Sequence, residues 1–295
     1  MSIGGVRKPL PELVPTDRTV ADERKQCDDR GCARETLPIQ RGDEDMRIYR
    51  AENYEEMSFR AADVIAAHIL LKPDAVLGLA TGSTPVGTYR ELVERYDRGK
   101  LSFGEVKSVN LDEYRGLSPE HEQSYRYFME DQLFRHIDIC PENTHVPNGI
   151  ATDLTEECRR YSRLIRELGR AELQLLGMGH NGHIGFNEPG ESFIPETHEV
   201  ELTEETIRAN QRFFASMEEV PTGALTMGIR EILSARHILL LVSGEDKAET
   251  LCKAVLGPVT PYLPASVLQL HQNVTLIGDR AALSRLEKEG AGICG

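Results

Sequence analysis

The sequence predicts an α/β fold, in which a doubly wound, mostly parallel sheet with helices on both faces forms three layers in the Rossmann-like manner. From residue 46 onward, short apolar runs without a helical period alternate with longer amphipathic segments, and this alternation is typical of strand–helix–strand units. Polar or glycine-rich stretches follow several of the apolar runs directly. Open α/β sheets bind ligands at the carboxyl ends of their strands. We therefore expect one catalytic domain over residues 46–295, with its site in these stretches and a helical lid over about residues 202–220.

The composition excludes several classes of protein. With 295 residues, of which 40% are hydrophobic, the chain can bury a large core. Asp and Glu number 48 against 34 Lys and Arg, and the net charge of −14 argues against general affinity for nucleic acid or for an anionic membrane. No apolar run reaches the length of a membrane span, and Met1 to Val14 lacks the apolar core of a signal peptide. We expect a soluble, cytoplasmic protein.

The first 45 residues differ from the rest of the chain. They are rich in charge, contain four prolines and show almost no apolar periodicity, so residues 1–45 are expected to be a disordered or loosely attached extension. The six cysteines of the chain lack CxxC spacing, which favours reduced thiols over a disulfide framework. Cys27 and Cys32 could bind a metal, but two thiols without a nearby histidine make a poor site.

The core-forming segments follow in order from Met46. An edge strand comes first, and the next helix would place one apolar face inward, made of Met57, Ala61, Val64, Ile65 and Ile69. The remaining strands are expected at residues 75–80, 106–111, 173–178, 237–244 and 274–278. Helices are expected at residues 54–70, 86–96, 122–137 and 155–168, and two further helices are expected to begin at residue 245 and to lie at the C-terminus. The two helices at 122–137 and 155–168 are interpreted as structural.

The turn after the strand at 75–80 reads TGSTP. A Ser or Thr cap followed by a Pro predicts that a helix begins here, and the free N–H groups of such a turn form an anion site. A sugar phosphate would suit Gly82, Ser83 and Thr84, although a simple capped turn is the alternative. The turn lacks the lysine of a P-loop, so a nucleoside triphosphate is not expected.

Two adjacent carboxylates, Asp112 and Glu113, follow the strand at 106–111. If the strand continues through them, their side chains point to opposite sides, so only one reaches the ligand. Either could be a general base. The alternative interpretation of the pair is a solvated turn or a helix cap.

The most distinctive stretch runs from Leu173 to Gly190 and reads LQLLGMGHNGHIGFNEPG. Its loop matches GxGxxG, but a dinucleotide fingerprint needs a helix to begin inside the motif, and the polar HIGFNEPG follows instead. His180 and His183 resemble a zinc pair, yet they lack helical spacing and a third ligand, so no metal is expected. The stretch is interpreted as a strand that delivers polar groups to a ligand site.

Basic residues that could hold an anion occur in two later segments. Leu202 to Val220 contains Arg208 and Arg212 and is interpreted as a helical flap, with an ordinary surface helix as the alternative. Lys247 lies in the first turn of the helix that follows the strand at 237–244. There it combines a positive charge with free helix N–H groups, which would suit a phosphate.

Four motifs together, LATGSTPVGTY, NLDEYRGL, GMGHNGHIGFNEP and SGEDKA, give the chain from about Met46 to its C-terminus a resemblance to a known family. It resembles the glucosamine-6-phosphate deaminases, also called glucosamine-6-phosphate isomerases. The resemblance implies an enzyme of amino-sugar catabolism that converts glucosamine 6-phosphate and water to fructose 6-phosphate and ammonia. No organic cofactor is implied, and the partner is a small sugar phosphate.

The resemblance also implies a role for each motif. His183 would open the pyranose ring, with Glu188 orienting and polarising it, and Asp112 would move a proton between C2 and C1 of the open chain. Arg212 would help to hold the phosphate, with Arg208 as a competing choice. The full phosphate set implied is Gly82, Ser83, Thr84, Arg212 and Lys247, and residues 202–220 resemble the family's mobile lid.

Two positions depart from patterns within that family. Many members have an aspartate where this chain has Asn181, which can hold an imidazole by a hydrogen bond but cannot supply charge or titrate. Some bacterial members are hexamers activated by an acetylated sugar phosphate through basic residues after the NEP motif. Here that region reads GESFIPETHEVEL, so we expect no such activation, and the family suggests either a monomer or a homo-oligomer.

Three other functions remain open at this point. A 6-phosphogluconolactonase typically continues the glycine-histidine loop as GHTASLFP, whereas this chain has GHIGFNEP. A galactosamine-6-phosphate deaminase differs only in one hydroxyl epimer of its substrate. A sugar-phosphate sensor would be expected to carry a DNA-binding helix-turn-helix and to have lost Asp112, His183 and Glu188.

Overall fold

The computed structural model describes residues 46–294. The extension predicted for residues 1–45, with Cys27 and Cys32, lies outside the described residues. Among residues 46–294, no helix is both long and apolar enough to cross a membrane.

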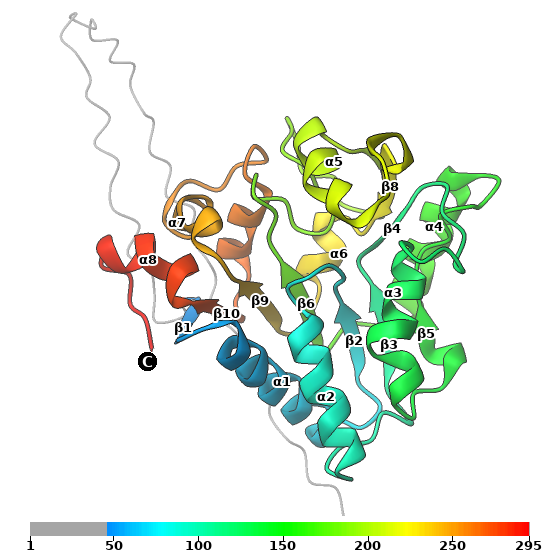
Figure 1. Cartoon of the computed structure of the whole chain (residues 1–295), viewed down its shortest axis with the longest axis horizontal. Coiled ribbons are helices and arrows are strands. Elements are labelled where there is room, and N and C mark those ends of the chain that lie inside the picture. The colour runs from blue at the N-terminus through cyan, green and yellow to red at the C-terminus, as the bar shows by residue number, and fades with distance from the viewer. Residues whose placement is uncertain (1–45, 295) are drawn as a thin grey trace, which may run out of the picture. The chain divides into compact units, whose positions relative to one another are not determined.

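Seven parallel strands form the central sheet, in the order β1-β10-β9-β6-β2-β3-β5 (Figure 1). Their bounds are β1 (Arg47–Ala51), β2 (Val76–Leu79), β3 (Lys107–Asn110), β5 (Thr144–His145), β6 (Leu173–Gly177), β9 (Ile238–Val242) and β10 (Val274–Asp279). Every residue of β2, β9 and β10 is buried, so both faces of the sheet are covered, as expected of a parallel sheet. The predicted α/β class is confirmed.

The strand order reverses between β2 and β6. From β2 the chain runs outward to β3 and β5, then returns to β6 on the other side of β2 and continues to β9 and β10. The loops that leave β2 and β6 therefore diverge around a crevice at the carboxyl ends of these strands. Such a reversal is where open α/β sheets bind ligands, and both loops were predicted to carry site residues.

Eight α-helices occur among residues 46–294: α1 (Tyr54–Leu71), α2 (Val86–Asp97), α3 (Tyr125–Gln132), α4 (Leu154–Leu168), α5 (Glu204–Asn210), α6 (Ile229–Leu233), α7 (Ala248–Leu256) and α8 (Arg280–Lys288). In α1, the Asn53 side chain accepts a hydrogen bond from the N–H of Glu56 and caps the first turn. Four of the five residues predicted for its apolar face are buried, and Val64 packs partly buried against the same core.

Two predictions about local structure are wrong. The helix α2 begins after Pro85, which is its N-cap and makes no side-chain hydrogen bond, so neither Ser83 nor Thr84 caps it. The helix expected over residues 122–137 is shorter, because α3 spans Tyr125–Gln132 and a separate 3₁₀ turn follows at Phe134–His136.

A second, antiparallel sheet was not predicted. Its order is β4-β8-β7, with β4 at Asp112–Tyr114, β8 at Gly223–Thr226 and β7 at His198–Glu201. The strand that ends as β3 at Asn110 thus continues into this sheet as β4, which places the two adjacent carboxylates on a strand.

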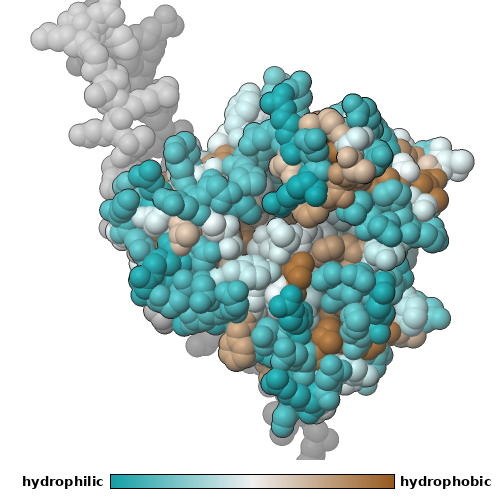
Figure 2. All heavy atoms as spheres, in the orientation of Figure 1, coloured by the Kyte–Doolittle hydropathy of each residue, from teal (hydrophilic) through white to brown (hydrophobic). Residues whose placement is uncertain are grey.

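The segment predicted as a lid connects β7 to β8. It contains α5 and two 3₁₀ turns at Gln211–Phe213 and Met217–Glu219. Figure 1 shows α5 above the ends of the central strands, and Phe214 packs against a small apolar cluster that includes Tyr114 and Phe186. In Figure 2 the surface facing the viewer is mostly hydrophilic, with paler and brown residues gathered near its centre below this segment.

Candidate active site

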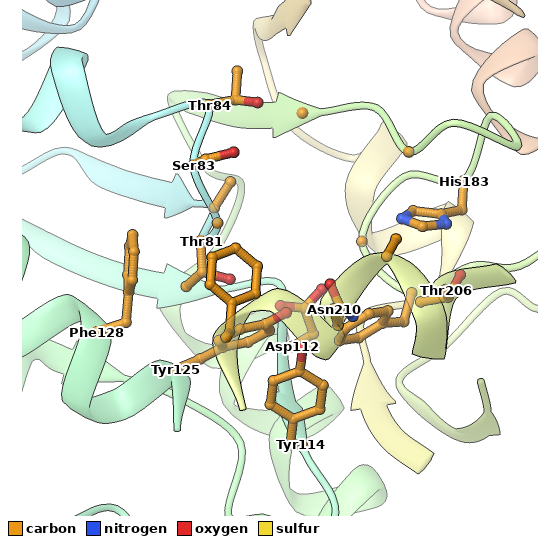
Figure 3. A pocket seen from close by; sticks show the side chains of 18 of the residues that line it. Thr81, Ser83, Thr84, Asp112, Tyr114, Tyr125, Phe128, His183, Thr206 and Asn210 are labelled. Carbon is orange, nitrogen blue, oxygen red and sulfur yellow. The ribbon is translucent and has the colours of Figure 1, made fainter. Parts of the chain in front are cut away.

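A cavity of about 360 Å³ lies where the β2 and β6 loops diverge. Its wall comes from the β2 loop, from β4, from the start of α3, from the β6 loop and from the lid segment (Figure 3). The parallel strands fix the two loops, and the antiparallel sheet brings β4 and both ends of the lid segment against them. Segments far apart in the sequence thereby line one cavity.

Most of the residues predicted for the site line this cavity, namely Gly82, Ser83, Thr84, Asp112, Asn181, His183, Arg212 and Lys247. Glu188 does not line it but lies behind His183, with which it is paired. Arg208, the competing choice for Arg212, is not in the wall, and its exposed guanidinium pairs with Glu204. The structure therefore brings the predicted groups together and separates the two arginines.

Five residues from a segment interpreted as purely structural also line the cavity. They are Glu122, Gln123, Ser124, Tyr125 and Phe128, from the beginning of α3 and the turn before it. Tyr125 stacks on Phe186 with ring centroids 5.9 Å apart, and its ring lies 4.7 Å from that of Tyr114. Nothing local in the sequence distinguishes these aromatic residues from core residues, because their exposure to the cavity depends on the packing of α3 against β4.

Of the two adjacent carboxylates, only Asp112 faces the cavity. Glu113 points away from it and accepts hydrogen bonds from the main-chain N–H groups of Tyr114, Tyr125 and Arg126, at 2.8, 2.9 and 2.9 Å. It thereby holds the first turn of α3 to β4. As the strand geometry predicts, the two side chains point to opposite sides, and only that of Asp112 lines the cavity; its contact with a ligand stays a prediction.

The environment of this pair favours its protonated form. Burial, and then the charge of Glu113, raise the pKa of Asp112 well above its usual range. Burial also raises the pKa of Glu113 to about 7, although its three main-chain hydrogen bonds oppose the shift. A buried carboxyl group with a raised pKa is suited to accept and return a proton near neutral pH.

His183 and Glu188 form a second group on the other wall. The Nδ1 atom of His183 lies 3.5 Å from Oε2 of Glu188, and both side chains are largely buried. Burial acts to raise the pKa of Glu188, but the pairing with His183, together with hydrogen bonds from Thr206 and Asn181, outweighs it and lowers that pKa. Glu188 is therefore an ionised partner that can orient the imidazole.

The side chain of Asn181 does not hold the imidazole as expected. Its Nδ2 donates to Oε2 of Glu188 at 2.7 Å, and its Oδ1 accepts from the main-chain N–H of His183 at 3.2 Å. The amide therefore fixes the carboxylate and the loop backbone, and acts on the ring only through Glu188.

The glycines of the β6 loop have packing roles that do not involve a dinucleotide. A Cβ at Gly179 would lie 2.3 Å from Cε1 of His183, so the imidazole rests directly on this glycine. Gly182 has a φ of +84°, and a Cβ there would lie 2.2 Å from Leu263. No helix begins between residues 178 and 203, which removes the helix that a dinucleotide fingerprint requires.

Neither histidine of the loop belongs to a candidate metal site. His180 is exposed and pairs with Asp246 at 2.5 Å. Within residues 46–294, no group of three or more His, Cys, Asp or Glu side chains is arranged to hold a metal ion.

The opposite end of the cavity is positively charged. Arg212 reaches from the lid segment to within 3.5 Å of Oγ of Ser83, and Lys247 lines the same wall. Burial and the charge of Arg212 lower the pKa of Lys247, against the opposing effect of Asp246 and Asp279. Two cations beside hydroxyl groups and the first turn of α2 make a site for an anion. The cavity can therefore bind an anion at one end and transfer protons at the other.

Comparison with known proteins gives a consistent result. Residues 50–277 match the family described as glucosamine-6-phosphate isomerases/6-phosphogluconolactonase. The chain is 56% identical over 232 residues to a glucosamine-6-phosphate deaminase of Lachnoclostridium phytofermentans, covering 79% of this chain and 98% of that protein. A Geobacillus protein of the same name is 55% identical over 244 residues, covering 83% of this chain and 97% of its own.

Two solved structures place the fold. A monomeric glucosamine-6-phosphate deaminase superposes with a TM-score of 0.80 at 52% identity, covering 81% of this chain and 100% of that chain. A 6-phosphogluconolactonase from Thermotoga maritima superposes with a TM-score of 0.64 at 20% identity, covering 80% of this chain and 100% of its own. At that identity the second likeness concerns the fold alone.

Proposed function

The chain belongs to the family of glucosamine-6-phosphate isomerases and 6-phosphogluconolactonases, and we propose that it is a deaminase that converts glucosamine 6-phosphate and water to fructose 6-phosphate and ammonia. The observation that carries the proposal is the joint presence, in one cavity, of the Asp112 carboxyl group, the His183 imidazole and an anion site at Ser83, Arg212 and Lys247. Relatives that share more than half of their residues with this chain bear the name of that activity.

In the proposed reaction the phosphate is bound first, by the two cations and the hydroxyl groups of the β2 loop. This contact orients the sugar along the cavity toward Asp112 and His183. The neutral imidazole of His183 then takes the proton of the C1 hydroxyl and returns a proton to the ring oxygen, which opens the ring. The Glu188 carboxylate stabilises the imidazolium that forms between these two steps.

The isomerisation is assigned to Asp112. Its carboxylate removes the proton from C2, giving an enolamine, and the carboxylic acid then protonates C1, giving a C2 imine. Water adds to the imine and ammonia leaves, so that the ketose phosphate is the product. The raised pKa of Asp112 supports this role, because the same group must accept a proton and give it back. Closure of the lid segment would keep that proton from exchanging with bulk water.

The deciding experiment measures ammonia and fructose 6-phosphate from the same reaction, with the native chain and with Asp112→Asn. The native chain should release both products in equal amounts. Asp112→Asn should lower kcat by about 10²- to 10⁴-fold, because the base is removed. Binding of glucosamine 6-phosphate without turnover would instead indicate a sugar-phosphate sensor. Hydrolysis of 6-phosphogluconolactone would indicate a lactonase, and faster turnover of galactosamine 6-phosphate would indicate a galactosamine-6-phosphate deaminase.

We propose further that the enzyme works as a monomer in the cytoplasm and without allosteric activation. The solved relative at 52% identity is a monomeric enzyme, and residues 190–202 lack an Arg/Lys cluster. Light scattering should therefore give the mass of one chain, and initial rates should follow a hyperbola. A sigmoidal plot of initial rate against substrate concentration that N-acetylglucosamine 6-phosphate makes hyperbolic would refute the absence of allosteric activation. Recovery of the protein in a membrane fraction would refute the cytoplasmic location.

A further inference from the structure

One hydrogen bond connects the lid segment directly to the carboxylate behind His183. Thr206 lies on α5 with its side chain at the cavity wall, and only 4% of the residue is exposed. Its Oγ1 donates to Oε1 of Glu188 at 2.5 Å. Figure 3 shows Thr206 on the lid helix, on the same side of the cavity as His183.

The direction of this hydrogen bond follows from its neighbours. Thr203 caps α5 by accepting from the N–H of Thr206 at 3.3 Å, and its own hydroxyl donates to Oγ1 of Thr206 at 3.1 Å. An ionised carboxylate can only accept. The Thr206 hydroxyl therefore accepts a hydrogen bond from Thr203 and donates its own to Glu188, so that the cap of the lid helix also orients this donor.

The two oxygens of Glu188 have different partners. Oε2 faces His183 and accepts from Asn181, both in the β6 loop, whereas Oε1 accepts from Thr206 in the lid segment. A carboxylate held at only one oxygen can rotate about its terminal bond, and a donor at the second oxygen fixes its plane. The orientation of Glu188 toward the imidazole thus depends on the position of α5.

We propose that Thr206 is a positioning residue that makes the ability of His183 to open the ring depend on the lid being in place. The assignment rests on the proposed function of the cavity. When α5 is seated, Thr206 completes the hydrogen bonds of Glu188 and fixes the imidazole for proton transfer. When α5 moves away, the Glu188 carboxylate loses one hydrogen-bond donor and is no longer fixed in its plane, so ring opening is slow until the lid is seated over a substrate.

The test compares Thr206→Val, which has the same shape without a hydroxyl, with Thr206→Ser, which keeps the hydroxyl. Thr206→Val should lower kcat about tenfold, as expected for the loss of a hydrogen bond to a charged group, and should leave KM nearly unchanged. Thr206→Ser should restore kcat, and the acid limb of kcat/KM should stay in place in both variants, because the raised pKa of Asp112 sets that limb. Thr222→Val, the same change at the other end of the lid segment, should behave as the native chain.

A second measurement does not require turnover. The pKa of Glu188 can be measured by following the ¹³C signal of its carboxyl carbon with pH, in the native chain and in Thr206→Val. This signal is assigned by its absence in Glu188→Gln. Thr206→Ala takes the place of Thr206→Val if the valine variant does not fold. The pKa of Glu188 should be higher in the variant. If the native chain has no deaminase activity, the proposed function fails while this titration still decides whether Thr206 acts on Glu188.

Two outcomes would overturn the inference. One is an unchanged Glu188 titration in Thr206→Val. The other is a loss of activity that Thr206→Ser fails to restore, because the side-chain volume and not the hydroxyl would then matter.

Discussion

Asn181 donates from its side-chain amide to the Glu188 carboxylate at 2.7 Å, while its amide oxygen accepts from the main chain of His183. Asn181 is therefore a neutral donor to the carboxylate that partners His183. In Asn181→Asp this donor becomes a second carboxylate at hydrogen-bonding distance. Like charges this close raise the pKa of the pair, so the acid limb of kcat/KM should move to higher pH while turnover at alkaline pH is largely kept. Asn143→Asp, which adds the same charge outside the cavity, should leave the profile unchanged, and an acid limb moved to lower pH would contradict the expectation.

Glu113 tunes Asp112 without entering the cavity. Because its charge helps to raise the pKa of Asp112, Glu113→Gln should lower that pKa, and the carboxylate needed as a base should be present at lower pH. We expect the acid limb of kcat/KM to move down by about one pH unit. Glu105→Gln removes an exposed carboxylate elsewhere and should have no such effect. If the acid limb of kcat/KM stayed in place in Glu113→Gln, burial alone would set the pKa of Asp112.

Arg212 and Arg208 provide a matched pair for testing the anion site. Arg212 lines the cavity beside Ser83, whereas Arg208 pairs with Glu204 at the surface. Arg212→Ala should raise KM for the sugar phosphate about tenfold or more, because a charge-assisted contact is lost, and should reduce the rise in Tm that inorganic phosphate produces. Arg208→Ala should keep both values near native, and equal effects of the two substitutions would place the phosphate elsewhere.

A histidine pair at the amino end of the sheet, of which His237 is buried, should make the fold sensitive to acid. His237 lies 2.9 Å from His68 and 2.8 Å from Thr275, and burial, followed by the charges of His68, Arg47 and His271, lowers its pKa to about 4. The unfolded chain binds this proton near pH 6.5, but the folded chain does not until about pH 4. Stability from this group is therefore complete above pH 6.5 and is lost as pH falls toward 4, by about 2 kcal/mol after allowance for solvent screening.

Urea unfolding at several pH values tests this linkage. The free energy of unfolding of His237→Gln should fall less steeply between pH 6.5 and pH 4 than that of the native chain. His136→Gln removes an exposed histidine and should keep the native slope. Parallel curves for the native chain and His237→Gln would rule out the proposed contribution.

The first 45 residues should be dispensable for catalysis. Every residue assigned to the site lies within residues 46–294, so a chain that begins at Met46 should fold and keep kcat/KM within about twofold of the full chain. Loss of folding or of turnover in the shortened chain, measured by circular dichroism and by ammonia release, would disprove the independence of the domain.

The sequence predicts the order and the location of the main elements well, because the signals involved are local. Apolar runs without a helical period locate six of the seven strands of the central sheet to within a few residues, whereas the two-residue strand β5 was not predicted. Glycines and polar residues directly after β2 and β6 indicate where ligands bind, and strand periodicity alone implies that one carboxylate of the Asp112–Glu113 pair faces the cavity.

What the sequence could not predict depends on pairing between distant segments. The strands β4, β7 and β8 are short, and β7 reads HEVE, so only their mutual pairing makes them a sheet. That sheet brings the start of α3 and the lid segment to the cavity.

The chemistry of His183 and Glu188 was implied by the motif, but their partners were decided in three dimensions. Arg208 and Arg212 are alike in sequence, and the end of α5 at Asn210 determines which of them faces the anion site. Likewise, Asn181 could have reached the imidazole, and only the fold of the loop turns its amide to Glu188. Local sequence patterns therefore determined the scaffold and the reactive groups. Tertiary packing decided the hydrogen-bond partners, because a side chain bonds to whichever groups the rest of the fold brings within about 3 Å.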